Sequence, residues 1–358
     1  MVSIAVQRLH NQHIENFGCS SPVDVVSSLG ALQGQDYPGA LWSVGVRLPG
    51  STKADIEQVL IDKTIVRTWA MRGTLQLVAA ADLRWMLALV APRQATTYAR
   101  RYRQLELDGI TLERTNTLIA DALRDGKPQT KSALIAMLQA NGISTEGQRG
   151  VFILNRASND GLICQSVMQG RDPTFQLIDD SIAQGAPLKG DDAVIELARR
   201  YFTTRAPAAI HDFVWWSGLR VSDARMAVDA LKSVLVEETI DGKGYWLPAD
   251  MPSIVSYQPS VHLLPGFDEF LISYRDRSAS LDPQHANAIV PGGNGMFIST
   301  IVVDGRVVGT WRREVKKREM VIRLEPFAPL TTAQREGAAL AARAYGDFLD
   351  MPARLVDD

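Results

Sequence analysis

Metal-binding and nucleophilic motifs are scarce in this chain. Its 358 residues include two cysteines and five histidines, and neither HExxH nor a cysteine-rich zinc spacing occurs. The phosphate-binding loop GxxxxGKS/T and the GxSxG nucleophile elbow are also absent. These absences argue against the common zinc, nucleotide-hydrolysing and serine-hydrolase classes. We therefore expect no metal and no cofactor.

Charge of neither sign dominates, because the chain has 38 basic and 40 acidic residues and a net charge of −2. This balance argues against a uniformly basic nucleic-acid coat but leaves room for local basic patches. Cys19 and Cys164 lie far apart, as expected for reduced thiols. The N-terminus lacks a signal-peptide pattern, and the most apolar stretch, Trp85–Ala91, is too short to span a membrane. We expect a cytoplasmic protein, associated with the nucleoid if it binds DNA.

A weak structural repeat runs along the chain, in which two or three helices precede a short hairpin. This order is typical of the winged-helix variant of helix-turn-helix. The length fits two to four modules. We predict an α+β fold of three tandem winged-helix modules and a C-terminal α+β portion, with these bounds: 1–108, 109–182, 191–250 and 251–358. The linker-like segment Ala183–Gly190 separates the second module from the third.

In the first module Ser21 and Pro22 form a helix start, and we expect that helix to reach about Leu32. Ser43–Leu48 (SVGVRL) is strand-like. A hairpin is predicted from Ile65–Ala70 and Thr74–Val78. After it we expect two separate helices, Asp82–Val90 and Arg93–Leu105.

The second module has predicted helices at Leu112–Leu123, Lys131–Ala140 and Thr145–Asn159. On the third helix Arg149 and Arg156 share one face. Because the last helix of a winged helix commonly enters the major groove, these arginines are DNA-binding candidates. A solvated surface face explains them equally simply, and the sequence leaves both interpretations open.

In the third module Trp215 and Trp216 lie in an apolar helix, so we expect both in the core. Farther on, VHLLPGFDEFLISYRDRS is interpreted as strand, turn and strand. Neighbouring residues of a strand point to opposite faces, so Asp268 and Glu269 are not expected to flank one reacting atom together.

A dense basic cluster lies between Arg312 and Arg323, where six basic residues accompany two acidic ones. Cations at this density can neutralise several phosphates, which makes affinity fall steeply with salt. The alternative is a solubilising turn. The DNA-binding candidates in the cluster are Arg312, Arg313, Lys316, Lys317 and Arg318.

Four segments resemble the winged-helix DNA glycosylases of the AlkZ type. They are LGALQGQD, TIVRTWAMRGTLQLV, LLPGFDEFLISYRDRS and VDGRVVGTWRR. In that family both glutamines of a Q-x-Q motif support catalysis, which implies catalytic roles for Gln33 and Gln35. Asp36 is a further base candidate. The similarity spans most of the chain and implies excision of N7-alkylated purines, extending to the unhooking of interstrand crosslinks.

The second of these segments forms the first-module hairpin, and the resemblance implies that it lies beside the glutamines. Arg67 and Arg72 are expected to contact DNA, with Arg72 at the wing tip. Trp69 and Gln76 are candidates to line the site. Relatives often have histidine where this chain has Gln76, so substrate range or activity can differ here.

The resemblance thus predicts a monofunctional DNA glycosylase, acting as a monomer on alkylated or crosslinked double-stranded DNA. An alkylated purine leaves as a neutral base, so positioning water and stabilising an oxocarbenium-like sugar are the remaining tasks. Carboxamides can do both without titrating. The alternatives are a non-catalytic winged-helix DNA-binding protein and, less directly, a protein-interaction scaffold.

Overall fold

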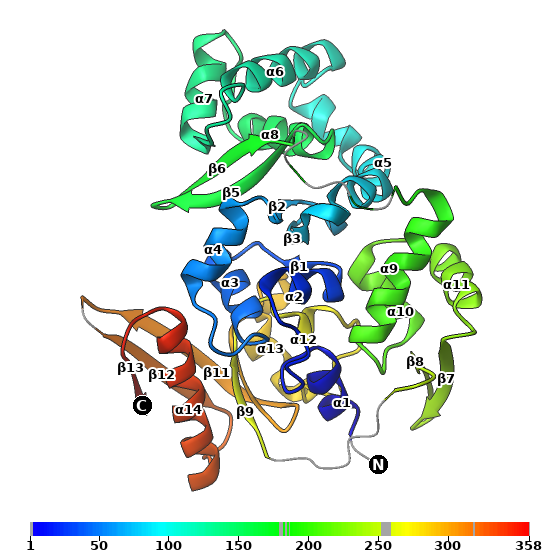
Figure 1. Cartoon of the computed structure of the whole chain (residues 1–358), viewed down its shortest axis with the longest axis vertical. Coiled ribbons are helices and arrows are strands. Elements are labelled where there is room, and N and C mark those ends of the chain that lie inside the picture. Colours follow the sequence, from blue (N-terminus) through cyan, green and yellow to red (C-terminus); the bar gives the residue numbers. More distant parts are fainter. Residues whose placement is uncertain are drawn as a thin grey trace. The chain divides into compact units, whose positions relative to one another are not determined.

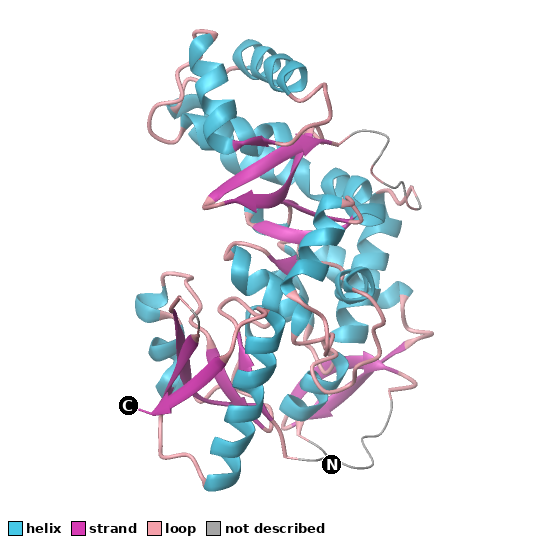
Figure 2. Cartoon of the chain, turned by 60° about the vertical axis from the view of Figure 1, so that its left-hand side comes forward, coloured by secondary structure: helices cyan, strands magenta, loops and turns pink. Residues whose placement is uncertain are grey.

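The computed structural model describes residues 3–178, 182, 185, 187–251, 259–317 and 319–357. Its contacts divide the chain into two compact units. One contains Met1–Ile56 and Val194–Asp358, and the other is Glu57–Ala193. Helices and strands are mixed in both units (Figures 1 and 2), which confirms the predicted α+β class. Within the described residues, no helix is both long enough and apolar enough to cross a membrane.

The unit Glu57–Ala193 combines a sheet with four helices packed near it. Strands β3, β2, β5, β6 and β4 lie side by side in that order, with antiparallel pairs throughout. Its elements are β2 (Ile65–Trp69), η1 (Met71–Gly73), β3 (Leu75–Ala79), α5 (Ala80–Gln104), α6 (Gly109–Ala122), β4 (Gln129–Thr130), α7 (Lys131–Ala140), α8 (Arg149–Asn159), β5 (Ile163–Gln169) and β6 (Asp172–Leu177). In sequence, α4 (Lys53–Ile61) and α9 (Gly190–Thr204) cross between the units.

From α6 to β6 three helices precede a hairpin, as predicted for the second module, and the short strand β4 between α6 and α7 was not predicted. The hairpin β2–β3 is also confirmed, with Met71–Gly73 at its turn. The predicted break near Pro92 is wrong, because α5 is one continuous helix of 25 residues. Pro92 is exposed, so the backbone group left without a helical partner faces solvent.

The unit that holds both chain ends contains a sheet in the order β13-β12-β11-β10-β9. Its pairs are antiparallel except β12 with β13, and α14 packs on β9 and β13 (Figure 1). Its remaining elements are α1 (Ile4–Asn11), α2 (Pro22–Leu29), β1 (Leu32–Gln33), α3 (Tyr37–Gly45), α10 (Ile210–Ser217), α11 (Val221–Ala230), β7 (Leu235–Ile240), β8 (Lys243–Pro248), β9 (Val261–Leu264), α12 (Glu269–Ile272), η2 (Pro283–His285), α13 (Ala286–Ile289), η3 (Pro291–Gly293), β10 (Thr300–Val303), β11 (Arg306–Val315), β12 (Met320–Pro326), α14 (Thr332–Phe348) and β13 (Ala353–Asp357).

Three predictions for this unit are wrong in detail. Helix α2 ends at Leu29 rather than Leu32, because Gly30 adopts φ 75° and stops the helix. The strand-like Ser43–Leu48 begins inside α3, a helix buried almost all round, where apolar residues need no helical spacing. The predicted second strand after Pro265 is instead the short helix α12, whose N-cap is Asp268.

The third predicted helix–hairpin unit matches α9, α10, α11 and the pair β7–β8. Asp241 (φ 50°) and Gly242 (φ 75°) form its two-residue turn, a conformation that glycine adopts without strain. Trp216 lies in the core as predicted. Trp215 does not, since 41% of its surface is exposed.

The predicted module boundaries stay predictions, as does the number of winged helices. Within the linker-like segment Ala183–Gly190, residues 183, 184 and 186 lie outside the described part of the chain. Residues 252–258, within the predicted C-terminal portion, also lie outside it.

Candidate active site

The loop between α2 and α3 carries the two glutamines of the Q-x-Q motif. Gly30 ends α2, and Asp36 is the N-cap residue of α3. Gln33 is only 5% exposed, whereas Gln35 and Asp36 are exposed. The first glutamine is therefore buried, and the second lies at the surface.

A hydrogen bond inside the loop links the two glutamines. The backbone N–H of Gln35 donates to the side-chain oxygen of Gln33. The backbone N–H of Gln33 itself donates to Oε1 of Glu269 at 2.9 Å. The loop is thus tied both to itself and to the start of α12.

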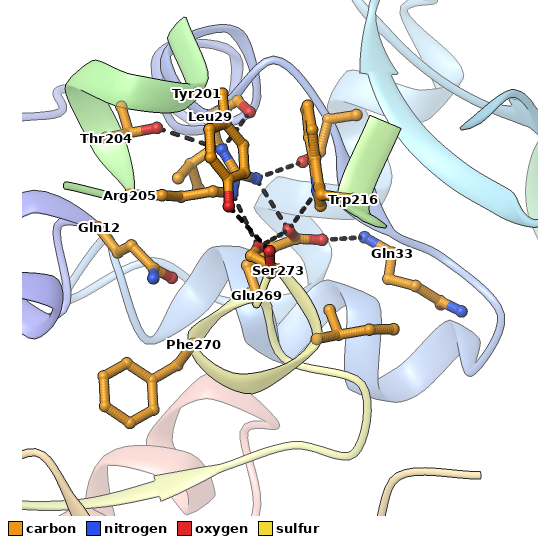
Figure 3. A network of polar contacts seen from close by, with 12 residues as sticks. Gln12, Leu29, Gln33, Tyr201, Thr204, Arg205, Trp216, Glu269, Phe270 and Ser273 are labelled. Carbon is orange, nitrogen blue, oxygen red and sulfur yellow. Dashed lines mark hydrogen bonds and ion pairs between the residues drawn. The ribbon is translucent and has the colours of Figure 1, made fainter. Parts of the chain in front are cut away.

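Glu269 lies at the centre of a buried polar network, drawn in Figure 3. Its Oε2 accepts hydrogen bonds from Arg205 Nη2 at 2.8 Å, from Trp216 Nε1 at 2.8 Å and from Ser273 Oγ at 2.5 Å. Arg205 also donates to the carbonyls of Leu29 and Ala31, just before the glutamines. Both residues of the Arg205–Glu269 ion pair are 1% exposed or less.

A second buried ion pair joins the adjacent Asp268 to Arg47. The two guanidinium nitrogens Nη1 and Nη2 of Arg47 lie 2.8 and 2.9 Å from the Asp268 oxygens, and Ser43 donates to the same carboxylate at 2.6 Å. Burial alone would raise the pKa of Asp268. The charge and hydrogen bonds of Arg47 outweigh burial and lower that pKa below its usual value.

Asp268 and Glu269 do not flank one reacting atom, but the reason differs from the predicted one. They do not alternate along a strand. Asp268 caps α12 through the Phe270 N–H, and each carboxylate pairs with its own buried arginine. Both are therefore structural groups, closed off from solvent.

A cavity of about 600 Å³ lies beside the exposed glutamine. Arg312 and Arg313 on β11 line it, so the glutamine loop and β11 meet there although they lie far apart in sequence. Its other polar and aromatic lining residues include Gln35, Asp36, Phe267 and Phe297. The sequence predicted Gln35 and Arg313 as site residues but gave no reason to place them together.

Two glycines allow the cavity walls to approach closely. A Cβ on Gly39 would come within 2.5 Å of Oδ2 of Asp36. One on Gly266 would come within 2.5 Å of the Phe297 carbonyl oxygen, which belongs to the backbone. Phe267 adopts φ 62°, in the left-handed region that a large side chain rarely occupies. Strain of this kind is often concentrated at functional sites.

The Arg313 guanidinium and the Asp36 carboxylate give the cavity a cation and an anion that interact. Burial lowers the pKa of the Arg313 guanidinium, and the charge of Asp36 opposes this shift. The guanidinium carbon also lies 5.5 Å from the centre of the Tyr345 ring. An arginine stays protonated at physiological pH, so the group is suited to bind a phosphate.

The other described candidates on β11 and in the turn after it face solvent. Arg312 pairs with Glu325 at 3.1 Å, and Lys316 and Lys317 are exposed. Arg318 lies outside the described residues. The cluster thus offers accessible basic surface to a polyanion near the β11–β12 turn.

The remaining DNA-binding candidates lie in the other unit, Glu57–Ala193. Arg67 is 5% exposed and donates to Gln165 Oε1, so its role here is structural. Arg149 donates to the backbone carbonyls of Ser144 and Glu106, and Arg156 pairs with Asp160 at 2.7 Å. Arg72 is partly exposed at the hairpin turn, with φ 57°.

Trp69 and Gln76 are also in that unit. Trp69 packs on its core, with its ring stacked 6.3 Å from that of Phe175. Gln76 is 2% exposed, and its Nε2 donates to Thr74 at 2.8 Å. In the described part of the chain the buried Gln76 Oε1 has no hydrogen-bond partner. That the hairpin lies beside the glutamines stays a prediction.

The comparisons with known proteins agree with this fold. A family model described as DNA glycosylase AlkZ-like matches residues 26–348. The chain is 27% identical to a Streptomyces sahachiroi protein named interstrand DNA cross-link repair glycosylase, over 98% of this chain and 97% of that one. The solved structure of Streptomyces sahachiroi DNA glycosylase AlkZ superposes with a TM-score of 0.79 at 22% identity, covering 99% and 98% of the two chains.

A mixed α+β chain with an exposed Q-x-Q glutamine at a cavity fits the class of DNA glycosylases. The family match covers most of its length. This chain belongs to the AlkZ-like DNA glycosylase family.

Sequence reasoning missed the residues that hold the motif in place. Glu269 was considered only as half of a carboxylate pair, and Arg205 and Trp216 carried no catalytic pattern. Their link to Gln33 spans up to 236 residues, so no local spacing could have revealed it.

Proposed function

We propose that this protein is a monofunctional DNA glycosylase that hydrolyses the N-glycosidic bond of N7-alkylated purines in duplex DNA. We extend the proposal to purines joined in interstrand crosslinks. Support comes from the family match and from the name of the Streptomyces sahachiroi relative. The proposal assigns Gln35 to the attacking water and Gln33 to the support of Gln35.

The observation that carries the proposal is the contrast between the two glutamines. Gln33 is buried and accepts the Gln35 N–H, while the Gln35 side chain is exposed at the cavity. A hydrolytic group must touch solvent and substrate together, and its main chain must be fixed for its side chain to be well oriented. Gln35 meets both conditions.

The chemistry needs little acid or base strength. Alkylation at N7 makes the purine cationic, so the base departs as a neutral molecule and the sugar develops oxocarbenium character. The Gln35 carbonyl oxygen would accept a hydrogen bond from the attacking water, which aligns it with the anomeric carbon. Asp36, exposed beside it, adds a negative charge that favours the developing cation and can accept the water proton.

DNA would be held by the cations around the same cavity. Arg313 and Arg312 line it, and the exposed Lys316 and Lys317 extend the basic surface into the β11–β12 turn. Phosphate contacts of this kind set the register of a duplex without reading its sequence. In the other unit, Arg72 at the hairpin turn is the most suitable further contact.

The proposal is tested by incubating the protein with a duplex that contains N7-methylguanine. Free base is measured by mass spectrometry, and abasic sites are counted after mild alkali. We expect base release from this duplex and none from the unmodified control. Salt-dependent binding without release would instead support a non-catalytic DNA-binding protein, and absence of binding would support an interaction scaffold.

A further inference from the structure

A continuous set of contacts leads from the buried network to the exposed glutamine. Arg205, Trp216 and Ser273 all donate to one oxygen of Glu269. The other oxygen of Glu269 accepts the Gln33 N–H (Figure 3). The Gln33 carboxamide in turn accepts the Gln35 N–H. Both oxygens are engaged, so the Glu269 carboxylate has a single orientation in which one oxygen faces the loop.

Between Gln33 and α3 the loop contributes no buried apolar side chain, whereas Ala31 and Leu32 before it are fully buried. Gly34, between the two glutamines, has no side chain and the largest backbone freedom of any residue. Gln35 and Asp36 are exposed. The conformation of this segment therefore depends strongly on anchors at its buried end, where Glu269 and Arg205 bind the backbone of Gln33, Leu29 and Ala31.

The stability of the fold alone does not explain why the charged pair Arg205–Glu269 is buried. A buried carboxylate–guanidinium pair can often be replaced by apolar residues without loss of stability, because desolvation offsets the attraction. Here the carboxylate is aimed at the backbone of a predicted catalytic loop. We propose that Glu269 is a positioning residue, which fixes the main chain of Gln33 and, through the Gln33 carboxamide, the main chain of Gln35. This inference rests on the proposed function of Gln35.

Glu269→Gln tests this role with a minimal change in shape. An amide has one acceptor oxygen and one donor group, whereas the carboxylate accepts at both ends. The amide can accept either from Gln33 or from Arg205 and Trp216, but its NH₂ group then faces a donor on the other side. If the NH₂ group faces Gln33, the bond to the loop is lost. If it faces Arg205 and Trp216, the bonds that fix the orientation of residue 269 are lost, and the loop is held less firmly.

The adjacent Asp268 provides a matched control, because it is also buried and paired with a buried arginine. Its partners are Arg47, Ser43 and the Phe270 N–H, all away from the glutamine loop. Asp268→Asn should disturb a buried ion pair to a similar degree while leaving the backbone bond to Gln33 intact. The two variants separate positioning from general loss of stability.

Two measurements on the full chain test whether Glu269 positions the glutamine loop. The first is hydrogen–deuterium exchange in peptides covering residues 29–36, which reports local opening without reference to activity. The second is the single-turnover rate of base release with saturating duplex, normalised to folded protein. We expect Glu269→Gln to raise exchange in this segment and to lower the rate at least about tenfold, with duplex affinity retained. Asp268→Asn should leave the rate per folded protein close to wild type and should raise exchange in residues 29–36 no more than in the rest of the unit.

Equal exchange and equal rates in the two variants would overturn the inference and leave the proposed function standing. Absence of base release from wild type would overturn the proposed function, and the exchange comparison would still decide whether Glu269 fixes the loop. If Glu269→Gln does not fold, Trp216→Phe removes one donor to Glu269 while keeping an aromatic ring at this position. Trp42→Phe is its control, because Trp42 is also buried and donates to Leu263. A raised exchange in residues 29–36 only for Trp216→Phe supports the inference, and equal exchange contradicts it.

Discussion

A carboxylate oxygen of Glu269 lies 2.9 Å from the backbone nitrogen of Gln33, although 236 residues separate them in sequence. This bond joins the segment FDEF to the Q-x-Q segment, two of the four segments through which the chain resembles its family. It gives a physical reason for both to occur together. The FDEF segment, through Glu269, holds the main chain of Gln33, and the exposed Gln35 follows two residues later.

The salt dependence of duplex binding should report the basic surface at the β11–β12 turn. We expect Lys316→Ala combined with Lys317→Ala to weaken duplex binding for all sequences alike. The slope of log K against log salt should become shallower by about 0.9 for each phosphate that the variant no longer neutralises. Fluorescence anisotropy across a salt series measures this slope.

The matching control is Lys127→Ala with Lys232→Ala, two exposed lysines that pair with acidic neighbours elsewhere. Their removal should leave the slope unchanged. If both double variants alter the slope equally, Lys316 and Lys317 contribute only to the net charge of the protein and make no phosphate contact.

The buried pair Asp268–Arg47 should make stability depend on pH in the acid range. The pKa of Asp268 is lowered in the folded state, so the associated stability is complete above the unfolded pKa of about 3.9 and is lost as pH falls toward the folded pKa. Asp268→Asn should lower the free energy of unfolding near neutral pH by about 3–5 kcal/mol. Urea titrations measure this difference, which should shrink below about pH 4. A difference that stays constant into the acid range would contradict the assignment.

Gln76 should be replaceable without loss of stability. Its Oε1 is buried without a partner in the described residues, and its Nε2 makes one bond to Thr74. Gln76→Leu gives up one hydrogen bond, worth about 1 kcal/mol, and removes an unsatisfied carbonyl that costs about 1–3 kcal/mol. We therefore expect an unchanged or higher melting temperature.

Thr115→Val serves as the comparison, because the Thr115 hydroxyl is buried and satisfied by the Leu112 carbonyl. That variant should lose about 1 kcal/mol. A larger loss in Gln76→Leu than in Thr115→Val would show that the Gln76 carbonyl has a partner in solution.

Local signals in the sequence predicted much of the fold. Ser21 with Pro22 predicted the start of α2. Thr331, which caps α14, and Asp241-Gly242, which forms the turn of β7–β8, are signals of the same local kind. Each depends on residues within one turn of the chain. The resemblance also pointed to the correct family over most of the length.

The predictions that were wrong depend on contacts between residues far apart in sequence. Ser43–Leu48 has the alternation of a strand, but α3 is buried on nearly every side and carries no polar face. Asp268 and Glu269 were predicted on a strand because their arginine partners, Arg47 and Arg205, lie too far away in sequence to be paired by inspection. The cavity that joins Gln35 to Arg313 arises only in the folded unit.

The central claim is that the exposed carboxamide of Gln35 drives hydrolysis, and one comparison tests it most directly. Single-turnover base release from an N7-methylguanine duplex is measured for Gln35→Ala and for Gln284→Ala, an exposed glutamine of the same unit outside the cavity. We predict that Gln35→Ala slows release at least about tenfold while duplex affinity is retained, and that Gln284→Ala matches wild type. A Gln35→Ala rate equal to that of wild type would contradict the account.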